Sequence, residues 1–277
     1  MKIENAQDLE LFRRYMQLTG VPSITDDPAG PGLTGKKLGI VNGSSWIILW
    51  STYFGRTLLP GVRLINIGNE AIQLNFMRAH EQGLECPPQV NIEKLVQYAR
   101  DLCELEKPDV ILSTCSTMNR SLSQMKKGLA EYRVPVVQID EPMMEKALSL
   151  GPRILVIATH GPTVNSTFSL LEETAQRMGI REPLQCKGAI VEDAFSLLGE
   201  GRIEEHNGTI AEQIRRVVKE GALDCVVLAQ LSMSVFKIQY PDAHKIFGIP
   251  VLTSGEEGFL RVKEIMTGKY ISSGEEV

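Results

Sequence analysis

One cysteine of this chain stands where a strand turns into a helix, a position suited to a catalytic base or nucleophile. Cys115 follows the apolar run at residues 110–112 and opens the polar stretch at residues 115–117. The N-terminal end of a helix carries unpaired N–H groups and a partial positive charge, and both favour a thiolate. We therefore predict a catalytic role for Cys115, against the commoner role of a cysteine as a small buried hydrophobe.

Short runs rich in Val, Ile and Leu alternate with longer amphipathic segments along the chain. The runs are continuously apolar, which is typical of parallel strands buried on both faces by helices. The pattern predicts an α/β fold. Strands are predicted at residues 38–41, 62–66, 110–113, 136–139, 154–158, 188–191, 225–229 and 251–253, and helices at residues 9–18, 92–106, 164–178 and 203–219.

The two halves of the chain share landmarks at one offset. Gly43 and Thr159 each follow the first strand of a half and lie 116 positions apart, while Cys115 and Gln230 lie 115 apart. This predicts two pseudo-symmetric lobes, each a four-stranded parallel sheet flanked by helices, with the active site in the cleft between them. We expect an N-terminal helix and linker at residues 1–34, the first lobe at 35–148 and the second at 149–277. We also expect a C-terminal helix that can pack back on the first lobe.

Four loops after strands are rich in hydroxyls, glycines and amides. In open parallel sheets ligands bind beyond the carboxyl ends of the strands, and helix N-termini at that edge offer N–H groups to an anion. We predict that these loops bind a small carboxylate. The candidate substrate-binding residues are Gly43, Ser44, Ser45, Ser116, Thr117, Thr159, Gly161, Thr163, Gln230 and Ser232.

Composition excludes several other classes of protein. The chain has 277 residues, 43% hydrophobic and 23% charged, with a net charge of −5, so no basic field attracts nucleic acid. No segment approaches the roughly 20 apolar residues that span a bilayer, and no basic, apolar leader opens the chain. We expect a cytoplasmic protein. Its 5 cysteines form no CxxC pair and no zinc spacing, which argues against disulfides and metal sites.

With its cysteine motif at residues 115–117, its threonine-rich loop at 159–163 and its duplicated lobes, the chain resembles the aspartate/glutamate (hydantoin) racemase superfamily over residues 36–266. These enzymes usually carry a Cys-Asn-Thr-like motif in one lobe and a Gly-Cys-Thr-like motif in the other. Here Ser116 replaces the asparagine, and Ala229, Gln230 and Leu231 occupy the second motif. The chain is therefore similar to a divergent member that lacks the second catalytic cysteine. The resemblance implies an enzyme without metal or cofactor, a small carboxylate substrate and a homodimer or larger assembly.

The residues that could replace the missing thiol each have two interpretations. Gln230 cannot transfer a proton at neutral pH, so we assign its amide to binding, and Ser232 either reaches the substrate or caps a helix. His160 titrates near neutrality and could supply the missing acid, or it is a loop histidine held by local hydrogen bonds. Glu141 could act as a second base if it leans into the cleft, although residues 140–142 favour an acidic helix cap.

Three further side chains have simpler interpretations. Trp46 and Trp50 lie four residues apart on a helix, a spacing that favours packing between lobes or subunits over a stacking site. Cys225 stands at the start of its strand, at the end away from the cleft, and is assigned to the core.

A lone thiol favours a one-sided reaction at the carbon next to a carboxyl group. Such reactions include decarboxylation with stereospecific protonation, isomerisation through a covalent adduct, and C–C or lactone cleavage. Two alternatives stay open: a non-catalytic protein that binds a small carboxylate, and a true racemase that uses His160 or Glu141 as the second base.

Overall fold

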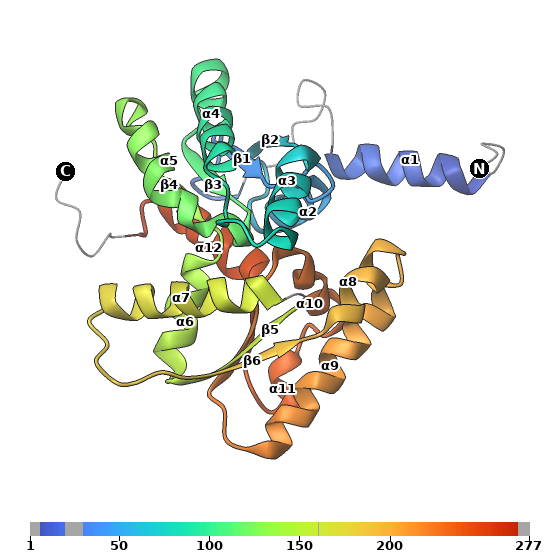
Figure 1. Cartoon of the computed structure of the whole chain (residues 1–277). Helices are drawn as coiled ribbons and strands as arrows, with labels where there is room; N and C mark the ends of the chain where they lie inside the picture. Colours follow the sequence, from blue (N-terminus) through green and yellow to red (C-terminus); the bar gives the residue numbers. More distant parts are fainter. Residues whose placement is uncertain (1–5, 20–29, 160, 271–277) are drawn as a thin grey trace.

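The computed structural model describes residues 6–19, 30–159 and 161–270, and it contains two four-stranded parallel sheets flanked by helices (Figure 1). The first sheet has the strand order β2-β1-β3-β4 and the second the order β6-β5-β7-β8. The same order recurs in the two halves, so the predicted α/β fold with two pseudo-symmetric lobes is confirmed. Below, the lobe built on each sheet is called the first or the second lobe.

The strands of the first sheet are β1 (Lys37–Asn42), β2 (Arg63–Gly68), β3 (Val110–Ser113) and β4 (Val136–Gln138), and those of the second are β5 (Arg153–Ala158), β6 (Gln185–Ile190), β7 (Cys225–Leu228) and β8 (Val251–Thr253). The helices of the first half are α1 (Ala6–Thr19), α2 (Ile48–Leu58), α3 (Glu70–Glu81), α4 (Gln89–Glu106), α5 (Leu122–Gly128) and α6 (Glu141–Leu150). Those of the second half are α7 (Gly161–Arg177), α8 (Glu192–Gly199), α9 (Ile203–Glu220), α10 (Phe236–Gln239), α11 (Ala243–Phe247) and α12 (Ser254–Met266). Three short 3₁₀ helices complete the described elements: η1 (Ser116–Ser121), η2 (Ala130–Tyr132) and η3 (Leu231–Val235).

Strand β6 differs most from its prediction, because it begins at Gln185 instead of residue 188. It is an edge strand of the second sheet, and Gln185 and Lys187 are exposed. An edge strand needs no continuous apolar run, since only one of its sides is paired and its faces are partly solvated. The run of apolar residues in the sequence therefore predicted only the C-terminal part of β6.

The central strands of each sheet are buried on both faces, as β5 illustrates. Ile154, Val156 and Ala158 pack into a core with helices α6 and α7, whereas Leu155 and Ile157 pack on the opposite face with α9. Successive side chains of a strand point to opposite faces, so a strand between two helix layers must be apolar at every position.

One helix of each half packs on the sheet of the other half. Met143, Met144 and Ala147 of α6 lie in the core of the second sheet. Phe259 and Val262 of α12 lie in the core of the first sheet, against residues of β1 and β3. By packing, α6 therefore belongs to the second lobe and α12 to the first. The division expected at residues 148 and 149 follows chain order only.

Close approach of α12 to the first sheet depends on a glycine. A Cβ atom added to Gly258 would come within 2.5 Å of Ile139 Cγ1 and 2.8 Å of the Ile139 carbonyl oxygen, the latter part of the backbone. No other residue fits there without displacing the helix. The last helix is therefore held tightly against the end of β4.

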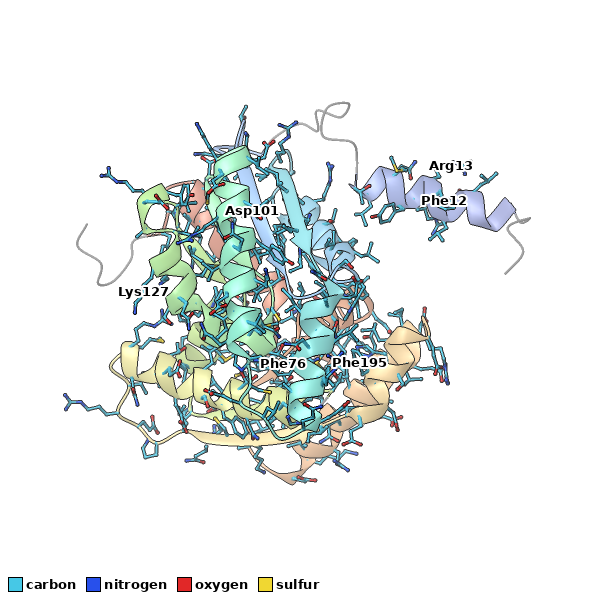
Figure 2. All side chains as sticks on the ribbon, turned by 45° about the horizontal axis from the view of Figure 1, so that its top comes forward. Phe12, Arg13, Phe76, Asp101, Lys127 and Phe195 are labelled. Atoms are coloured by element: carbon cyan, nitrogen blue, oxygen red, sulfur yellow. The ribbon has the colours of Figure 1, made fainter. Side chains whose placement is uncertain are left out.

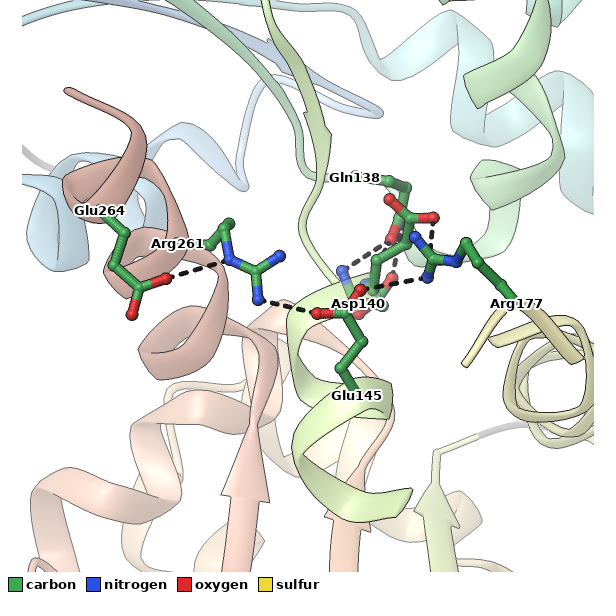
Figure 3. A network of polar contacts seen from close by, with 7 residues as sticks. Gln138, Asp140, Glu145, Arg177, Arg261 and Glu264 are labelled. Carbon is green, nitrogen blue, oxygen red and sulfur yellow. Dashed lines mark hydrogen bonds and ion pairs between the residues drawn. The ribbon is translucent and has the colours of Figure 1, made fainter. Parts of the chain in front are cut away.

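Ion pairs join the exchanged helices at the junction of the lobes (Figure 3). Arg261 of α12 donates to Glu145 of α6 at 2.7 Å, and Arg177 of α7 lies 3.3 Å from the same carboxylate. Glu145 therefore connects three helices that come from both halves of the chain.

The pseudo-symmetry extends to single hydrogen bonds. Asp109, before β3, accepts a bond of 2.8 Å from the backbone N–H of Lys37 at the start of β1. Asp224, before β7, accepts a bond of 2.9 Å from the backbone N–H of Arg153 at the start of β5. In each lobe an aspartate thus closes the amino-terminal end of the two central strands.

The N-terminal helix extends away from the first lobe (Figure 1). Its last residue, Thr19, is bound through its carbonyl oxygen by Arg56 of α2 at 2.8 Å. The predicted linker falls largely on residues 20–29, which lie outside the described residues. Among the helices that are described, none is long and apolar enough to cross a membrane.

The exchange of α6 and α12 predicts that the two lobes unfold together. Phe259→Ala is expected to destabilise the protein by about 3–5 kcal/mol, because it empties a fully buried site in the first lobe. Trp46 and Trp50 of the first lobe contact Phe195 and Ser232 of the second, so their fluorescence reports on the junction of the lobes, and far-UV circular dichroism reports on the helices and strands of both lobes. We expect one denaturant transition for both probes, shifted equally by the substitution.

The control is Leu105→Ala at an 80% exposed position of α4, which should change stability by less than about 0.5 kcal/mol. Two separate transitions, of which Phe259→Ala moves only one, would contradict the mutual dependence of the lobes.

Candidate active site

A pocket opens between the lobes at the carboxyl ends of the strands. The first lobe contributes the ends of β1 and β3, and the second contributes α8 and the residues after β7. Of the predicted site residues, the pocket is lined by Gly43, Ser44, Cys115, Ser116, Thr117, Gln230 and Ser232. Residues from both halves of the chain thus line one pocket at the carboxyl ends of the strands.

Cys115 is held by its neighbours on β1. Val41 of β1 pairs with Ser113 of β3, so the chain segments that follow the two strands run side by side. The backbone N–H of Thr114 donates to the Val41 carbonyl at 3.0 Å, and its hydroxyl donates to the Asn42 side chain at 2.8 Å. These bonds fix the backbone next to the thiol.

The thiol itself lies against Gly43. A Cβ atom at this glycine would come within 2.4 Å of the Cys115 sulfur and 3.0 Å of its Cβ. Only glycine leaves room for the side chain in this position. The residue after β1 therefore determines where the sulfur points.

The environment of Cys115 does not favour a thiolate, contrary to the prediction from the helix end. Burial raises the pKa of the thiol above its ordinary value, and the charge of Asp140 acts in the same direction. A contact of 3.4 Å with the Thr117 hydroxyl and the N–H groups that follow act against this rise without cancelling it. Desolvation therefore outweighs the hydrogen bonds from the Thr117 hydroxyl and from the N–H groups of Thr117 and Met118.

Asp140 is a buried carboxyl group that the sequence predicted only as a helix cap. It stands at the N-cap of α6, but its side chain makes no capping bond. It instead accepts hydrogen bonds from Ser116 at 3.0 Å and Gln138 at 2.7 Å. Figure 3 labels Gln138 and Asp140. Burial raises its pKa to about 6, even though these bonds favour the charged form. Ser116 thus connects the residue next to the thiol to a buried acid.

Gln230 occupies in the second lobe the place of Cys115 in the first. Its side-chain oxygen accepts bonds from the backbone N–H of Thr159 at 2.8 Å and from the Thr159 hydroxyl at 2.9 Å. Because a backbone N–H can only donate, the oxygen end of the amide must face Thr159. The amide is therefore held in one orientation at the pocket wall.

The lobes also meet through Trp50, whose indole N–H donates to the Ser232 carbonyl at 3.0 Å. This bond ties α2 to the segment that carries Gln230 and Ser232. Trp50 thus serves packing between the lobes, while Trp46 lines the pocket itself.

The remaining candidates lie outside the pocket lining. Ser45 bonds to Glu70 and helps to lower the pKa of that carboxyl. Thr159 and Thr163 are buried and Gly161 begins α7; the pocket lining does not include these three residues. His160 lies outside the described residues.

Two titratable residues weighed from the sequence are placed away from the pocket. Glu141 lies 3.5 Å from Arg177 and does not line the pocket, and burial raises its pKa. Cys225 is fully buried at the other end of the second sheet, where burial raises its pKa to about 12. Within the described part of the chain, no three His, Cys, Asp or Glu side chains gather as metal ligands would.

A group of apolar side chains also lines the pocket, and sequence reasoning missed most of it. It consists of Trp46, Ile47, Phe76, Met77, Met118 and Phe195. Figure 2 labels Phe76 on α3 and Phe195 on α8, which line the same pocket from the two lobes. Phe76 and Met77 come from α3, Trp46 and Ile47 from the turn before α2, and Phe195 from α8 of the other half, so only tertiary packing brings them together.

Comparison with known proteins agrees with this geometry. The family model described as Asp/Glu/Hydantoin racemase matches residues 77–263. No curated protein matches the chain by sequence.

Among solved structures, an aspartate racemase homologue from Pyrococcus horikoshii has a TM-score of 0.61 and 17% identity, covering 84% of this chain and 99% of its own. Glutamate racemase RacE1 from Bacillus anthracis has a TM-score of 0.58 and 14% identity, covering 85% and 83%. Unliganded arylmalonate decarboxylase has a TM-score of 0.53 and 13% identity, covering 85% and 94%. At such identities the likeness concerns the fold.

Gly43→Ala is expected to move the thiol of Cys115. The added methyl group overlaps the sulfur, so the side chain must turn away and its rate of alkylation by iodoacetamide should change at least about fivefold, as read for the Cys115 peptide by mass spectrometry. The control is Gly208→Ala in α9, where a Cβ meets nothing within 4 Å. If both variants label like the wild type, Gly43 does not position the thiol.

The wild type is expected to lose stability as the pH rises from 4 to 7, and Asp140→Asn is expected to reduce this loss. The folded-state pKa of about 6 lies above the ordinary value of 3.8, so the folded protein binds this proton more tightly than the unfolded chain. The stability that this proton contributes, up to about 3 kcal/mol, is present below pH 4 and is lost as the pH rises through 6.

Thermal unfolding of wild type and variant at several pH values checks this. As the pH rises, the free energy of unfolding of the wild type should fall relative to that of the variant. A constant cost of the new amide does not alter this pH dependence. A difference that does not vary with pH would show that Asp140 titrates normally.

Proposed function

Because the chain belongs to the Asp/Glu/hydantoin racemase family, we propose that it is an enzyme that transfers a proton at the carbon next to a carboxyl group of a small acid, with Cys115 as the transferring group. The proposal requires neither a metal nor an organic cofactor. It places the reaction among isomerisations or C–C bond cleavages, and it excludes racemisation between two thiols.

One observation carries the proposal. Among the described residues that line the pocket, Cys115 is the only one with an ionisable side chain. The matching place in the second lobe holds the amide of Gln230, which can donate a hydrogen bond but cannot deliver a proton. A reaction that needs proton transfer on one face only is therefore favoured.

The raised pKa of Cys115 favours the thiol as a proton donor. At neutral pH the thiol is therefore protonated, and the negative charge of a bound carboxylate would raise its pKa further. In a decarboxylation, the C–C bond to one carboxylate breaks, CO₂ leaves, and the electron pair stays as an enolate. The thiol then donates its proton to the carbon, and the thiolate regains a proton from water.

The remaining carboxylate and the enolate need hydrogen-bond donors. The hydroxyls of Ser44, Thr117 and Ser232 and the amide of Gln230 line the pocket. Fixed donors of this kind stabilise negative charge that develops on an oxygen. We assign these residues to substrate binding. Next to the thiol, we assign the same role to the backbone of Gly43 and the hydroxyl of Ser116.

A non-catalytic protein that binds a small carboxylate is the second candidate. It is favoured by the absence of a second acid or base among the described lining residues. A two-base racemase would instead need His160 or a displaced Glu141.

Incubation of the protein with small acids in deuterated buffer, followed by proton NMR, tests the proposal. We expect deuterium incorporation next to the carboxyl group, or product formation, for at least one acid of a panel of amino acids, malonates, maleate and hydantoins. Cys115→Ala should lower the rate at least about 100-fold, the effect of losing a positioned proton donor.

Cys115→Ser controls for packing, because it keeps the shape of the side chain and removes the titrating thiol. Exchange that survives Cys115→Ala unchanged would overturn the assignment. Thermal stabilisation by an acid that is never turned over would support the binding protein instead.

A further inference from the structure

We propose that the N-terminal helix α1 packs on helix α2 of a second copy of this chain, while α1 of the second copy packs on α2 of the first. The two copies are then joined by two equivalent contacts between α1 and α2, related by a two-fold axis. The side chains that carry this inference do not line the pocket, so it is independent of the proposed reaction.

One half of the α1 surface is apolar and open to solvent. The side chains on this half are 48–67% exposed, and they are Leu9, Leu11, Phe12, Tyr15 and Met16. With 3.6 residues per turn, these five positions fall within one half of the helix circumference. The other half carries Glu10, Arg13, Arg14 and Gln17. Both arginines pair with Glu10, so the polar half satisfies its own charges and the apolar half faces water.

The body of the same copy does not cover this apolar half. In the described structure, the buried cores of the two lobes include no residue of α1. Arg56 of α2 holds the last residue, Thr19, by its carbonyl oxygen, and the helix extends from there away from the first lobe (Figure 1). A helix of 14 residues without a packed face is marginal in water, so α1 needs a partner surface.

The outer face of α2 offers such a surface. Leu49 and Tyr53 lie one turn apart on it and are 43% and 37% exposed. Arg56, which holds the end of α1, follows Tyr53 by three residues and therefore lies on the same face. The apolar surface of α2 is thus continuous with the base of α1, and α1 of the same copy leaves it exposed.

A second copy of the chain supplies the complement to both surfaces. Because one chain carries both, a two-fold arrangement satisfies each surface with the other and closes without further growth. Free side chains of this size expose roughly 150–250 Å² each, so the seven exposed side chains of α1 and α2 amount to roughly 700 Å² per copy. The pair of copies buries about 1,400 Å² of side-chain surface in this way, within the range of about 1,200–2,000 Å² typical of stable interfaces.

Charge disfavours a membrane as the partner of α1. Helices that lie on membranes carry an excess of Lys and Arg on their polar half, which anionic lipids attract. In α1 the two arginines are balanced by Asp8 and Glu10, and the whole chain has a net charge of −5. The apolar half of α1 is therefore suited to an uncharged protein surface such as that of Leu49 and Tyr53.

Sedimentation equilibrium of the full-length protein tests the inference. We expect the wild type to have twice the mass of the chain at micromolar concentrations. Phe12→Glu, at a 63% exposed position of α1 (Figure 2), should weaken association at least about 100-fold, because it places a charge in each of the two apolar contacts. Leu49→Glu should weaken association similarly, although it changes the other helix.

Two control variants are matched to these substitutions. Gln17→Glu adds the same charge to the polar half of α1, and Leu105→Glu adds it at an apolar, 80% exposed position of α4. Both should associate like the wild type. All four positions are exposed in the single chain, so the lobes should stay folded in every variant, as far-UV circular dichroism checks.

A mixture of the Phe12→Glu and Leu49→Glu variants tests the reciprocal contact. A mixed pair keeps one undamaged contact, between α1 of the Leu49→Glu copy and α2 of the Phe12→Glu copy. The mixture should therefore associate at least about tenfold more tightly than either variant alone.

Four results would overturn the inference. A monomeric wild type would show that α1 does not join two copies, and association unchanged in both variants would place the contact elsewhere. Loss of association in Phe12→Glu but not in Leu49→Glu would show that the α1 helices pair with each other. Binding of the wild type, but not of Phe12→Glu, to vesicles of phosphatidylcholine and phosphatidylserine would assign α1 to a membrane.

Discussion

The site depends on the parallel pairing of the first and third strands in each lobe. Val41 pairs with Ser113 in the first sheet and Ile157 with Leu228 in the second, and in both lobes the functional pair lies two residues beyond. In the first lobe this pair is Gly43 and Cys115, packed against each other. In the second it is Thr159 and Gln230, joined by hydrogen bonds. One backbone register thus provides two equivalent places, and the side chains there differ.

The chemistry of the two places follows from what surrounds them. The glycine in the first lobe leaves room for a sulfur atom that is partly buried, and burial keeps that thiol protonated. The threonine in the second lobe offers two donors that hold the glutamine amide in one orientation. The cleft therefore combines one proton donor with fixed hydrogen-bond donors, and the described lining adds no charge. The two places thus differ in single side chains, whereas their backbone register is the same.

The sequence predicted the strands well because buried parallel strands leave continuous apolar runs, and it placed Cys115 at the strand end for the same reason. It failed at the edge strand β6, where burial is incomplete. It assigned Asp140 to a helix cap, since sequence does not show that the side chain turns inward toward Ser116. Phe76 and Phe195 were not foreseen, because helix faces from different halves meet only after folding. The sign of the Cys115 pKa shift was wrong, since desolvation is a property of the packed structure.

The exchange of helices also constrains the order in which the chain can be completed during synthesis. The core of the first sheet includes Phe259 and Val262, which leave the ribosome after all eight described strands. Until then the core on this face of β1 and β3 has only the partners that its own half supplies, such as Ile47 and Phe54. During this time the core of the nascent first lobe is incomplete, and a chaperone can bind its exposed apolar surface. The second sheet differs, because its exchanged helix, α6, is translated before its first strand.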